Sequence, residues 1–237
     1  DGVEDPDHLI DWLHAWHPQQ PGARSYSNIS IGLLGHITAD AMGMSFADAL
    51  QTQLFPALGL TNTWVDVPAD AAGLYAFGYD RKTNAPIRVT PGLLDDEAYG
   101  VKSSARDMLT LLDVELAKGD VSSDLREAVS RTQIGQFQTR LFTQAMIWEA
   151  YPWPADIERM AEGNGYDFIL EPQRMDDVKG AAGEVIFNKT GSTNGFGGYI
   201  AMVPSQDLGV VVLANRNYPN EVRVRATYAL ITRILAE

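Results

Sequence analysis

The sequence predicts a fold of the α/β class, of the α+β type, with an antiparallel sheet flanked by helices and a separate helical region. Three strand-like runs follow one another near the end of the chain, and the polar turn 204–207 joins the last two as a hairpin. An amphipathic pattern then ends the chain, as expected for a helix that covers one face of an antiparallel sheet. Earlier segments carry apolar residues at the three- and four-residue spacings of helices.

Residues 1–150 are predicted to be mostly helical, with small peripheral strands. The second helix follows the Tyr26-Ser27-Asn28 turn and stops at Gly43, a residue type that favours helix ends. Ser104, followed three residues on by Asp107, is a start signal of the capping-box kind for another helix. The expected helices are 7–16, 28–43, 45–56, 104–119 and 124–132, and the expected short β-rich pieces are 62–67, 74–79 and 87–90.

Residues 151–184 are rich in acidic side chains and lose the apolar periodicity, so we expect an irregular, solvated excursion there. Residues 185–237 are expected to hold the sheet strands and the C-terminal helix. The strands are predicted at 185–187, 198–203 and 208–214, and the helix at 224–235. The three parts, 1–150, 151–184 and 185–237, together are expected to form one domain.

Composition excludes several classes of function. The chain has 237 residues, of which 45% are hydrophobic, so it can bury a sizeable core. A net charge of −13 opposes binding to nucleic acids and anionic membrane surfaces. Without any cysteine, disulfides, thiolate metal sites and a cysteine nucleophile are impossible. Asp11, His14 and His17 fall one turn apart on the first predicted helix, but a solvated face is the better interpretation, and no metal or cofactor is assigned.

Two short motifs could carry chemistry. Tyr26-Ser27-Asn28 stands at a predicted helix start, where free backbone N–H groups and a partial positive charge favour an ionised neighbour. Lys189-Thr190-Gly191-Ser192 ends a predicted strand and combines a cation, a hydroxyl and a small residue that lets a ligand approach the backbone. This set suits an anionic substrate whose carbonyl carbon is attacked.

The two motifs and their surroundings resemble the class C β-lactamases, in which Tyr-x-Asn replaces the Ser-Asp-Asn of related enzymes. The order of the matching segments is what makes the resemblance specific, because it runs nearly from end to end of the chain. The matching segments are Pro21-Gly22, Tyr26-Ser27-Asn28, Ile31-Gly32-Leu33, Ala98-Tyr99-Gly100-Val101-Lys102-Ser103, Lys189 to Gly197, and Leu213 to Asn220. The resemblance implies the β-lactamase/transpeptidase-like fold and a periplasmic location.

The resemblance implies acyl transfer through a serine ester, with cephalosporins as the preferred β-lactams. Tyr26 would be the general base and acid, and Lys189 would stabilise its phenolate, because a phenol ordinarily loses its proton near pH 10. The backbone N–H of Ser192 would donate to the oxyanion. Asn28 would bind the side-chain amide of the substrate, and Tyr99 would line the pocket.

The resemblance also implies recognition of the carboxylate that β-lactams carry. Thr190, Asn220 and Arg223 would bind this group, and Gly191 would allow the substrate to approach the strand. An arginine fork suits a carboxylate because it can donate to both oxygens.

The nucleophile of the family lies in a Ser-x-x-Lys motif upstream of the tyrosine, and no lysine of this chain has a serine three residues before it. We therefore expect a partial domain that corresponds to the C-terminal portion of the family, inactive alone and with exposed apolar surface. The serine would lie outside the chain, in a missing N-terminal segment. Two alternatives stay open: a penicillin-binding D-Ala-D-Ala peptidase or esterase of the same fold, and a truncated module without catalysis.

Overall fold

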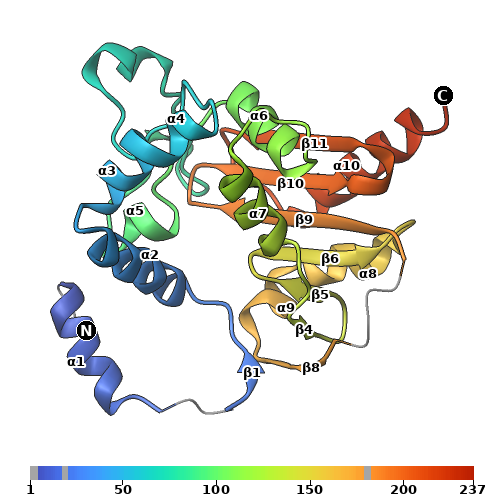
Figure 1. Ribbon diagram of the computed structural model, residues 1–237, viewed down its shortest axis with the longest axis horizontal. Coiled ribbons are helices and arrows are strands. Elements are labelled where there is room, and N and C mark those ends of the chain that lie inside the picture. Colours follow the sequence, from blue (N-terminus) through green and yellow to red (C-terminus); the bar gives the residue numbers. More distant parts are fainter. Residues whose placement is uncertain (1–4, 18–20, 179–182) are drawn as a thin grey trace.

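A seven-stranded antiparallel sheet forms the centre of the computed structural model, which describes residues 5–17, 21–178 and 183–237. Its strand order is β11-β10-β9-β6-β5-β4-β8 (Figure 1). Two further pairs, β1 with β7 and β2 with β3, are separate two-stranded sheets. The strands are β1 Ala23–Arg24, β2 Gly78–Tyr79, β3 Pro86–Ile87, β4 Phe137–Gln138, β5 Thr143–Ala145, β6 Trp148–Pro152, β7 Gln173–Arg174, β8 Asp176–Asp177, β9 Val185–Ser192, β10 Gly197–Val203 and β11 Leu208–Ala214.

Helices cover both faces of the sheet, and others form a separate region beside it (Figure 1). The α-helices are α1 Pro6–Ala15, α2 Asn28–Met42, α3 Phe46–Asp48, α4 Phe55–Ala57, α5 Asp95–Ala98, α6 Ala105–Glu115, α7 Ser123–Thr132, α8 Ile157–Gly163, α9 Tyr166–Leu170 and α10 Asn220–Ile234. A π-helix joins α3 to α4 over residues 49–54, and short 3₁₀-helices span 69–74 and 204–206.

Each face of the sheet has its own core. On one face Ile186 of β9 and Tyr199 of β10 pack with Val224 and Ile231 of α10 and Met160 of α8. On the other face Leu112 of α6 packs against Trp148, Ala150, Phe187 and Met202. This alternation of side chains between two covered faces follows from the pleat of the strands. The result is a three-layer arrangement that makes β9 and β10 rigid, since both faces are packed.

The two helix starts predicted from capping residues are confirmed. The Ser27 side chain accepts a hydrogen bond from Ser30 N (3.3 Å) at the start of α2, and Ser104 accepts one from Asp107 N (3.1 Å) at the start of α6. At the other end of α2, Gly43 adopts the left-handed conformation (φ 66°) that ends helices.

Helix α2 packs closely against α5. A Cβ atom added at Gly32 would lie 2.6 Å from Leu94 Cβ, and one added at Gly35 would lie 2.7 Å from Glu97 Cβ. Both distances are too short for real side chains, so the two glycines allow the close approach of the helices. This packing places the α5 end, where Tyr99 is the capping residue, beside α2.

The main sheet is larger than the sequence predicts. β4, β5 and β6 belong to it, although they lie in or border the part expected to be helical with peripheral strands. They are two to five residues long, and residues 148–151 of β6 are all buried, so no alternation of polar and apolar residues marks that strand. These three strands form because of tertiary contacts, which the local sequence pattern does not reveal.

The acidic segment 151–184 is not irregular throughout. It holds α8 and α9, because Met160, Ala161, Phe168 and Ile169 face the core while the acidic side chains face solvent. Asp156 caps α8 by accepting from the backbone N–H groups of Glu158 and Arg159. Helices of seven and five residues are too short to show a clear period in the sequence.

Smaller differences concern element bounds. α6 ends at Glu115, before the expected Gly119, and α10 begins at Asn220, before the expected Val224. The piece 62–67 is not a strand, since only Trp64 there forms an isolated bridge, with Lys102. Within the described residues, no helix has the length and the apolar character needed to cross a membrane.

Helix α2 exposes a set of large apolar side chains. Leu34 and Ile37 are each 62% exposed, and Ile29 and Ile31 are more than 40% exposed. Isolated apolar residues on a surface are ordinary, but several on one helix form a patch of the kind that usually contacts another protein segment. The expected exposure of apolar surface is therefore present on this helix.

The covering of the sheet by α10 is testable at two neighbouring positions. Ile231 is fully buried against the sheet, whereas Leu230 is 47% exposed. We expect Ile231→Ala to lower the free energy of unfolding by about 2–5 kcal/mol because it leaves a cavity, and Leu230→Ala to change it by about 0.5 kcal/mol or less. Urea unfolding followed by circular dichroism measures both. Equal effects of the two substitutions would contradict this packing of α10.

Candidate active site

The site predicted from the two motifs lies where β9 loses one of its neighbours. β10 pairs with β9 from Phe187 to Ser192, but β6 pairs only as far as Asn188, opposite Glu149. Among the described residues, the β6-facing edge of 189–192 therefore has no strand partner. Unpaired backbone N–H and C=O groups on such an edge can bind a ligand. The edge is rigid because its other side is fully paired.

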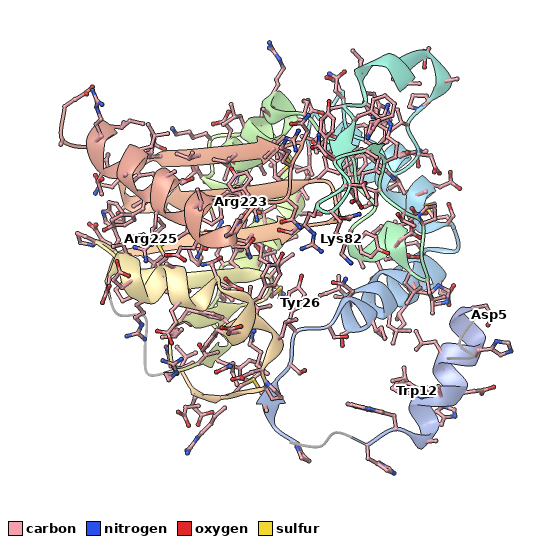
Figure 2. All side chains as sticks on the ribbon, turned by 180° about the vertical axis from the view of Figure 1, so that it is seen from behind. Asp5, Trp12, Tyr26, Lys82, Arg223 and Arg225 are labelled. Carbon is pink, nitrogen blue, oxygen red and sulfur yellow. The ribbon has the colours of Figure 1, made fainter. Side chains whose placement is uncertain are left out.

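Tyr26 and Lys189 come together at this edge. Lys189 Nζ lies 5.2 Å from the centroid of the Tyr26 ring, although 163 residues separate the two in sequence. Lys189 Nζ also donates a hydrogen bond to the backbone oxygen of Thr190 (2.6 Å). Tyr26 is 41% exposed and lies between the sheet and α2 (Figure 2). The pair therefore combines an accessible phenol with a neighbouring cation.

Ser192, Gly191, Asn220 and Arg223 form a second group beside the pair. Arg223 Nη2 donates to Ser192 Oγ (2.8 Å) and to Asn220 Oδ1, and Arg223 Nη1 donates to the backbone oxygen of Gly191 (3.3 Å). Ser192 Oγ donates to Asn220 Oδ1 (3.2 Å). One strand end and one helix start are thus joined by hydrogen bonds.

Arg223 is an unusual cation because it is only 1% exposed. Burial lowers the pKa of its guanidinium, while the nearby Tyr218 and Tyr166 oppose this effect. No carboxylate among the described residues forms an ion pair with it. Its side chain is buried behind Ser192 and Asn220, to both of which it donates hydrogen bonds.

Thr190 is buried in β9, whereas Asn28 is exposed in the first turn of α2. Tyr99 is 37% exposed, and burial together with the charge of Asp95 raises the pKa of its phenol. No hydrogen bond joins the side chain of Asn28 or Tyr99 to the β9 edge in the described part of the chain. The structure thus connects Ser192, Gly191, Asn220 and Arg223 directly, and Tyr26 with Lys189, but leaves Asn28 and Tyr99 at the helical side.

A buried polar network behind the edge joins the predicted Asn220 to Asn164 and Asn188, which the sequence prediction did not name. Asn188 Nδ2 donates to the backbone oxygen of Glu149 (2.8 Å), and Asn164 Nδ2 donates to Asn188 Oδ1 (2.9 Å). Asn220 Nδ2 donates to the backbone oxygen of Asn164 (2.9 Å). The only signal in the sequence was the polar Asn188 inside an apolar strand, and its role depends on α8, which periodicity does not reveal.

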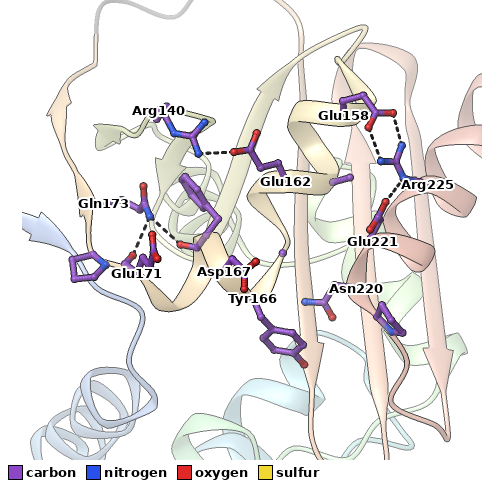
Figure 3. Close-up of a pocket in the computed structure, with 15 residues that line it drawn as sticks. Arg140, Glu158, Glu162, Tyr166, Asp167, Glu171, Gln173, Asn220, Glu221 and Arg225 are labelled. Atoms are coloured by element: carbon purple, nitrogen blue, oxygen red, sulfur yellow. Dashed lines mark hydrogen bonds and ion pairs between the residues drawn. The ribbon is translucent and has the colours of Figure 1, made fainter.

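A large hollow among the described residues lies elsewhere. It is an open groove of about 820 Å³ between α8, α9 and the start of α10, and it shares only Asn220 with the predicted site (Figure 3). Its charged residues mostly pair with one another: Arg225 contacts Glu158 (2.6 Å) and Glu221 (2.8 Å), and Arg140 contacts Glu162 (2.5 Å). Exposed ion pairs of this kind are typical of a solvated surface. We therefore place the candidate active site at the β9 edge, on the chemistry of its residues.

Comparison with known proteins shows which family the chain belongs to. A family model described as beta-lactamase matches residues 1–233. The chain belongs to the β-lactamase family. Among solved structures, this β-lactamase family member is similar to the class C β-lactamase from Rhodobacter sphaeroides, with 73% identity and a TM-score of 0.97 over 99% of this chain and 67% of that one. It is therefore class C-like, and its β-lactamase/transpeptidase-like fold is confirmed.

Two further relatives show the range of this β-lactamase family. A β-lactamase from Psychrobacter immobilis is 40% identical over 98% of this chain, and the match spans only 59% of that protein. A structure from Pseudomonas syringae, named both β-lactamase and D-alanine carboxypeptidase, is 44% identical with a TM-score of 0.92, over 97% of this chain and 65% of that one. The chain thus spans about 60% of the length of the curated relatives it matches.

Two adjacent glycines of β10 test the position of Arg223 in this β-lactamase family member. A Cβ atom at Gly197 would overlap with Arg223 Nη1, whereas one at Gly198 would have its nearest neighbour, Leu213 Cδ2, at 3.9 Å. We expect Gly197→Ala to destabilise the fold by about 1–3 kcal/mol through overpacking, which corresponds to a melting temperature lowered by about 2–4 °C for each kcal/mol. Gly198→Ala should leave it unchanged or slightly raised. Thermal unfolding of both variants decides, and equal melting temperatures would place Arg223 elsewhere.

Proposed function

We propose that the chain is part of a class C-type serine β-lactamase that hydrolyses the amide of a β-lactam through an acyl-enzyme, with cephalosporins as preferred substrates. The observation that carries the proposal is the placement of Tyr26 and Lys189 at the open edge of β9, beside Ser192. A phenol next to a cation, a strand edge without a strand partner and a buried arginine together suit attack on the carbonyl of an anionic substrate.

Each group has one task in the proposed reaction. Tyr26, as phenolate, takes the proton of the serine hydroxyl while the serine oxygen bonds to the β-lactam carbonyl carbon. Lys189 stabilises the phenolate, and the backbone N–H of Ser192 donates to the oxygen that gains negative charge. Tyr26 then gives the proton to the ring nitrogen as the C–N bond breaks. Hydrolysis of the serine ester by water completes the cycle.

The remaining predicted residues bind the substrate in this proposal. Thr190 and Asn220 donate hydrogen bonds to the substrate carboxylate in this proposal, and Gly191 leaves room for its approach. Arg223 supplies positive potential without direct contact, because its side chain is buried behind Ser192 and Asn220. Asn28 and Tyr99, on the helical side, would contact the substrate from across the edge.

The nucleophile is proposed to lie outside these 237 residues. No serine stands three residues before any of the five lysines, and the relatives are substantially longer than this chain. The apolar patch on α2 supports the same proposal, because it offers a surface on which a further segment could pack. By this proposal the chain alone is inactive, and the complete protein acts in the periplasm.

A D-alanyl-D-alanine peptidase or esterase of the same fold is the second candidate. It is favoured by the similarity to the Pseudomonas syringae protein, whose name includes both activities. The two functions differ in the rate at which the acyl-enzyme is hydrolysed. A long-lived penicilloyl adduct would favour the peptidase, and rapid turnover would favour the β-lactamase.

The test compares the 26.0 kDa chain with the protein extended by its upstream coding region. Both are incubated with a slowly hydrolysed β-lactam and examined by intact-protein mass spectrometry. We expect an adduct only on the longer polypeptide, or on a co-purifying N-terminal fragment. An adduct on the chain itself would refute the external nucleophile, and no adduct on either form would refute the enzyme function.

Tyrosine substitutions in the extended protein test the proposed base. We expect Tyr26→Phe to lower kcat for a chromogenic cephalosporin about 100-fold or more, as is typical for loss of a general acid–base group. Tyr228→Phe is the control, because Tyr228 packs against Trp153 and donates its hydroxyl hydrogen to the backbone oxygen of Ala155 (2.7 Å), away from the β9 edge. Equal activity of the two variants would exclude Tyr26 as the base.

A further inference from the structure

Two buried charges lie directly behind the Tyr26–Lys189 pair and have no task in the proposed reaction. Arg24 precedes Tyr26 by two residues, and its side chain is 11% exposed. Glu149 lies on β6 and its side chain is 1% exposed. Arg24 Nη2 is 3.4 Å from Glu149 Oε1. Since isolated buried charges are costly, such a pair calls for an explanation.

Arg24 is attached to three strands. Its Nε donates to Gln144 Oε1 (2.8 Å) on β5, and its guanidinium lies 5.2 Å from the centroid of the Phe142 ring. Its backbone pairs with Gln173 on β7. Gln144 and Glu149 are themselves opposite one another across β5 and β6, so both acceptors face the arginine from one place. The chain that leads into Tyr26 is therefore fixed to the sheet at residue 24.

Stability alone is a poor explanation of the pair. Arg24 Nη1 and Glu149 Oε2 are buried without a hydrogen-bond partner in the described part of the protein. A buried ion pair that is not fully hydrogen-bonded contributes little net stability, and its best-attested use is to select one arrangement of the packed elements. The geometry around the pair indicates which arrangement that is.

Both members of the pair are next to the site. Two residues of extended chain span at most about 7 Å, so the position of Arg24 restricts that of Tyr26, whose intervening neighbour Ser25 is exposed. Glu149 is paired with Asn188, the residue before Lys189. Burial raises the pKa of Glu149, and the charges of Lys189 and Arg24 oppose this effect, so the carboxylate senses both cations.

We propose that Arg24 and Glu149 are positioning residues that hold the Tyr26 ring against the Lys189 ammonium group. Glu149 fixes the Arg24 fork on β6, and Arg24 fixes the start of α2 so that Tyr26 faces the open edge of β9. Neither residue touches the substrate in this scheme. The functional meaning of the pair rests on the roles proposed for Tyr26 and Lys189, but the geometry can be tested without them.

The experiment observes the Tyr26–Lys189 contact itself by nuclear magnetic resonance. The full chain is labelled at the ε-carbon of its five lysines, and Lys189→Arg identifies the signal of Lys189. The ε-protons of a lysine over an aromatic ring are shifted upfield by the ring current. We expect such a shift for Lys189, and we expect Tyr26→Leu to abolish it.

Arg24→Met and Glu149→Gln should each remove at least half of this upfield shift while the circular dichroism spectrum stays that of the folded chain. The matched control is Arg174→Met, because Arg174 pairs with Ala23 in the same small sheet but has a side chain that is 88% exposed. The control should keep the full shift. A merely structural role would lower the melting temperature without altering the shift of the folded state.

The proposal is overturned if Arg24→Met or Glu149→Gln folds and keeps the full upfield shift of the Lys189 ε-protons. It is also overturned if the unsubstituted chain shows no such shift, or a shift that Tyr26→Leu does not abolish. Should Arg24→Met fail to fold, the isosteric Glu149→Gln decides by the same criterion. The measurement needs neither the serine nor a β-lactam. Its outcome is therefore separate from the acylation test of the proposed function.

Discussion

The unequal pairing of β9 is the constraint on which the candidate site depends. Along its whole second half this strand is bonded to β10, while its pairing with β6 stops at Asn188. A strand that is paired on one side and open on the other offers an edge for binding that is held in place by its paired side. Packing on both faces of the sheet reinforces this rigidity, because α10 and α6 press on β9 and β10 from opposite directions. The packed core thus holds the groups at the β9 edge in fixed positions.

Buried polar groups behind the edge also hold β9 in place. Asn188, Asn164, Asn220 and Arg223 link β9 to α8 and α10 through side-chain hydrogen bonds. Each of these groups is buried, and a buried polar group must be bonded or it destabilises the fold. The network therefore fixes the separation of two helices from the strand more strictly than apolar contacts could. Arg223 and Asn220, at one end of this network, orient Ser192 through hydrogen bonds to its hydroxyl group.

Local features of the sequence were enough to predict the elements that carry the site. Ser27 and Gly43 delimit α2 by their capping properties, and the strand before Lys189 follows from its apolar residues. Capping residues and apolar runs act over a few neighbouring positions, so a single sequence is enough to reveal them. The motif order added the likeness to class C β-lactamases, which the comparisons confirm.

The parts that escaped prediction depend on contacts distant in the chain. β6 is buried on both sides and shows no alternation, and α8 and α9 are too short for a period to emerge. Arg24 and Glu149 are 125 residues apart, and neither has a local pattern that singles it out. The sequence predicts Arg223 as a substrate-binding residue. Its burial depends on the packing of α10 against β10, which the sequence alone does not reveal.

The glycines of α2 have a consequence for how such a site can change. Gly32 and Gly35 set the spacing between α2 and α5, and therefore between the elements that carry Asn28 and Tyr99. A single added methyl group at either position would force the two helices apart without altering any reactive group. The distance between Asn28 and Tyr99, which are proposed to contact the substrate, is thus governed by two glycines that would not touch it, so a mutation there could admit a substrate of another shape while leaving Tyr26 and Lys189 unchanged.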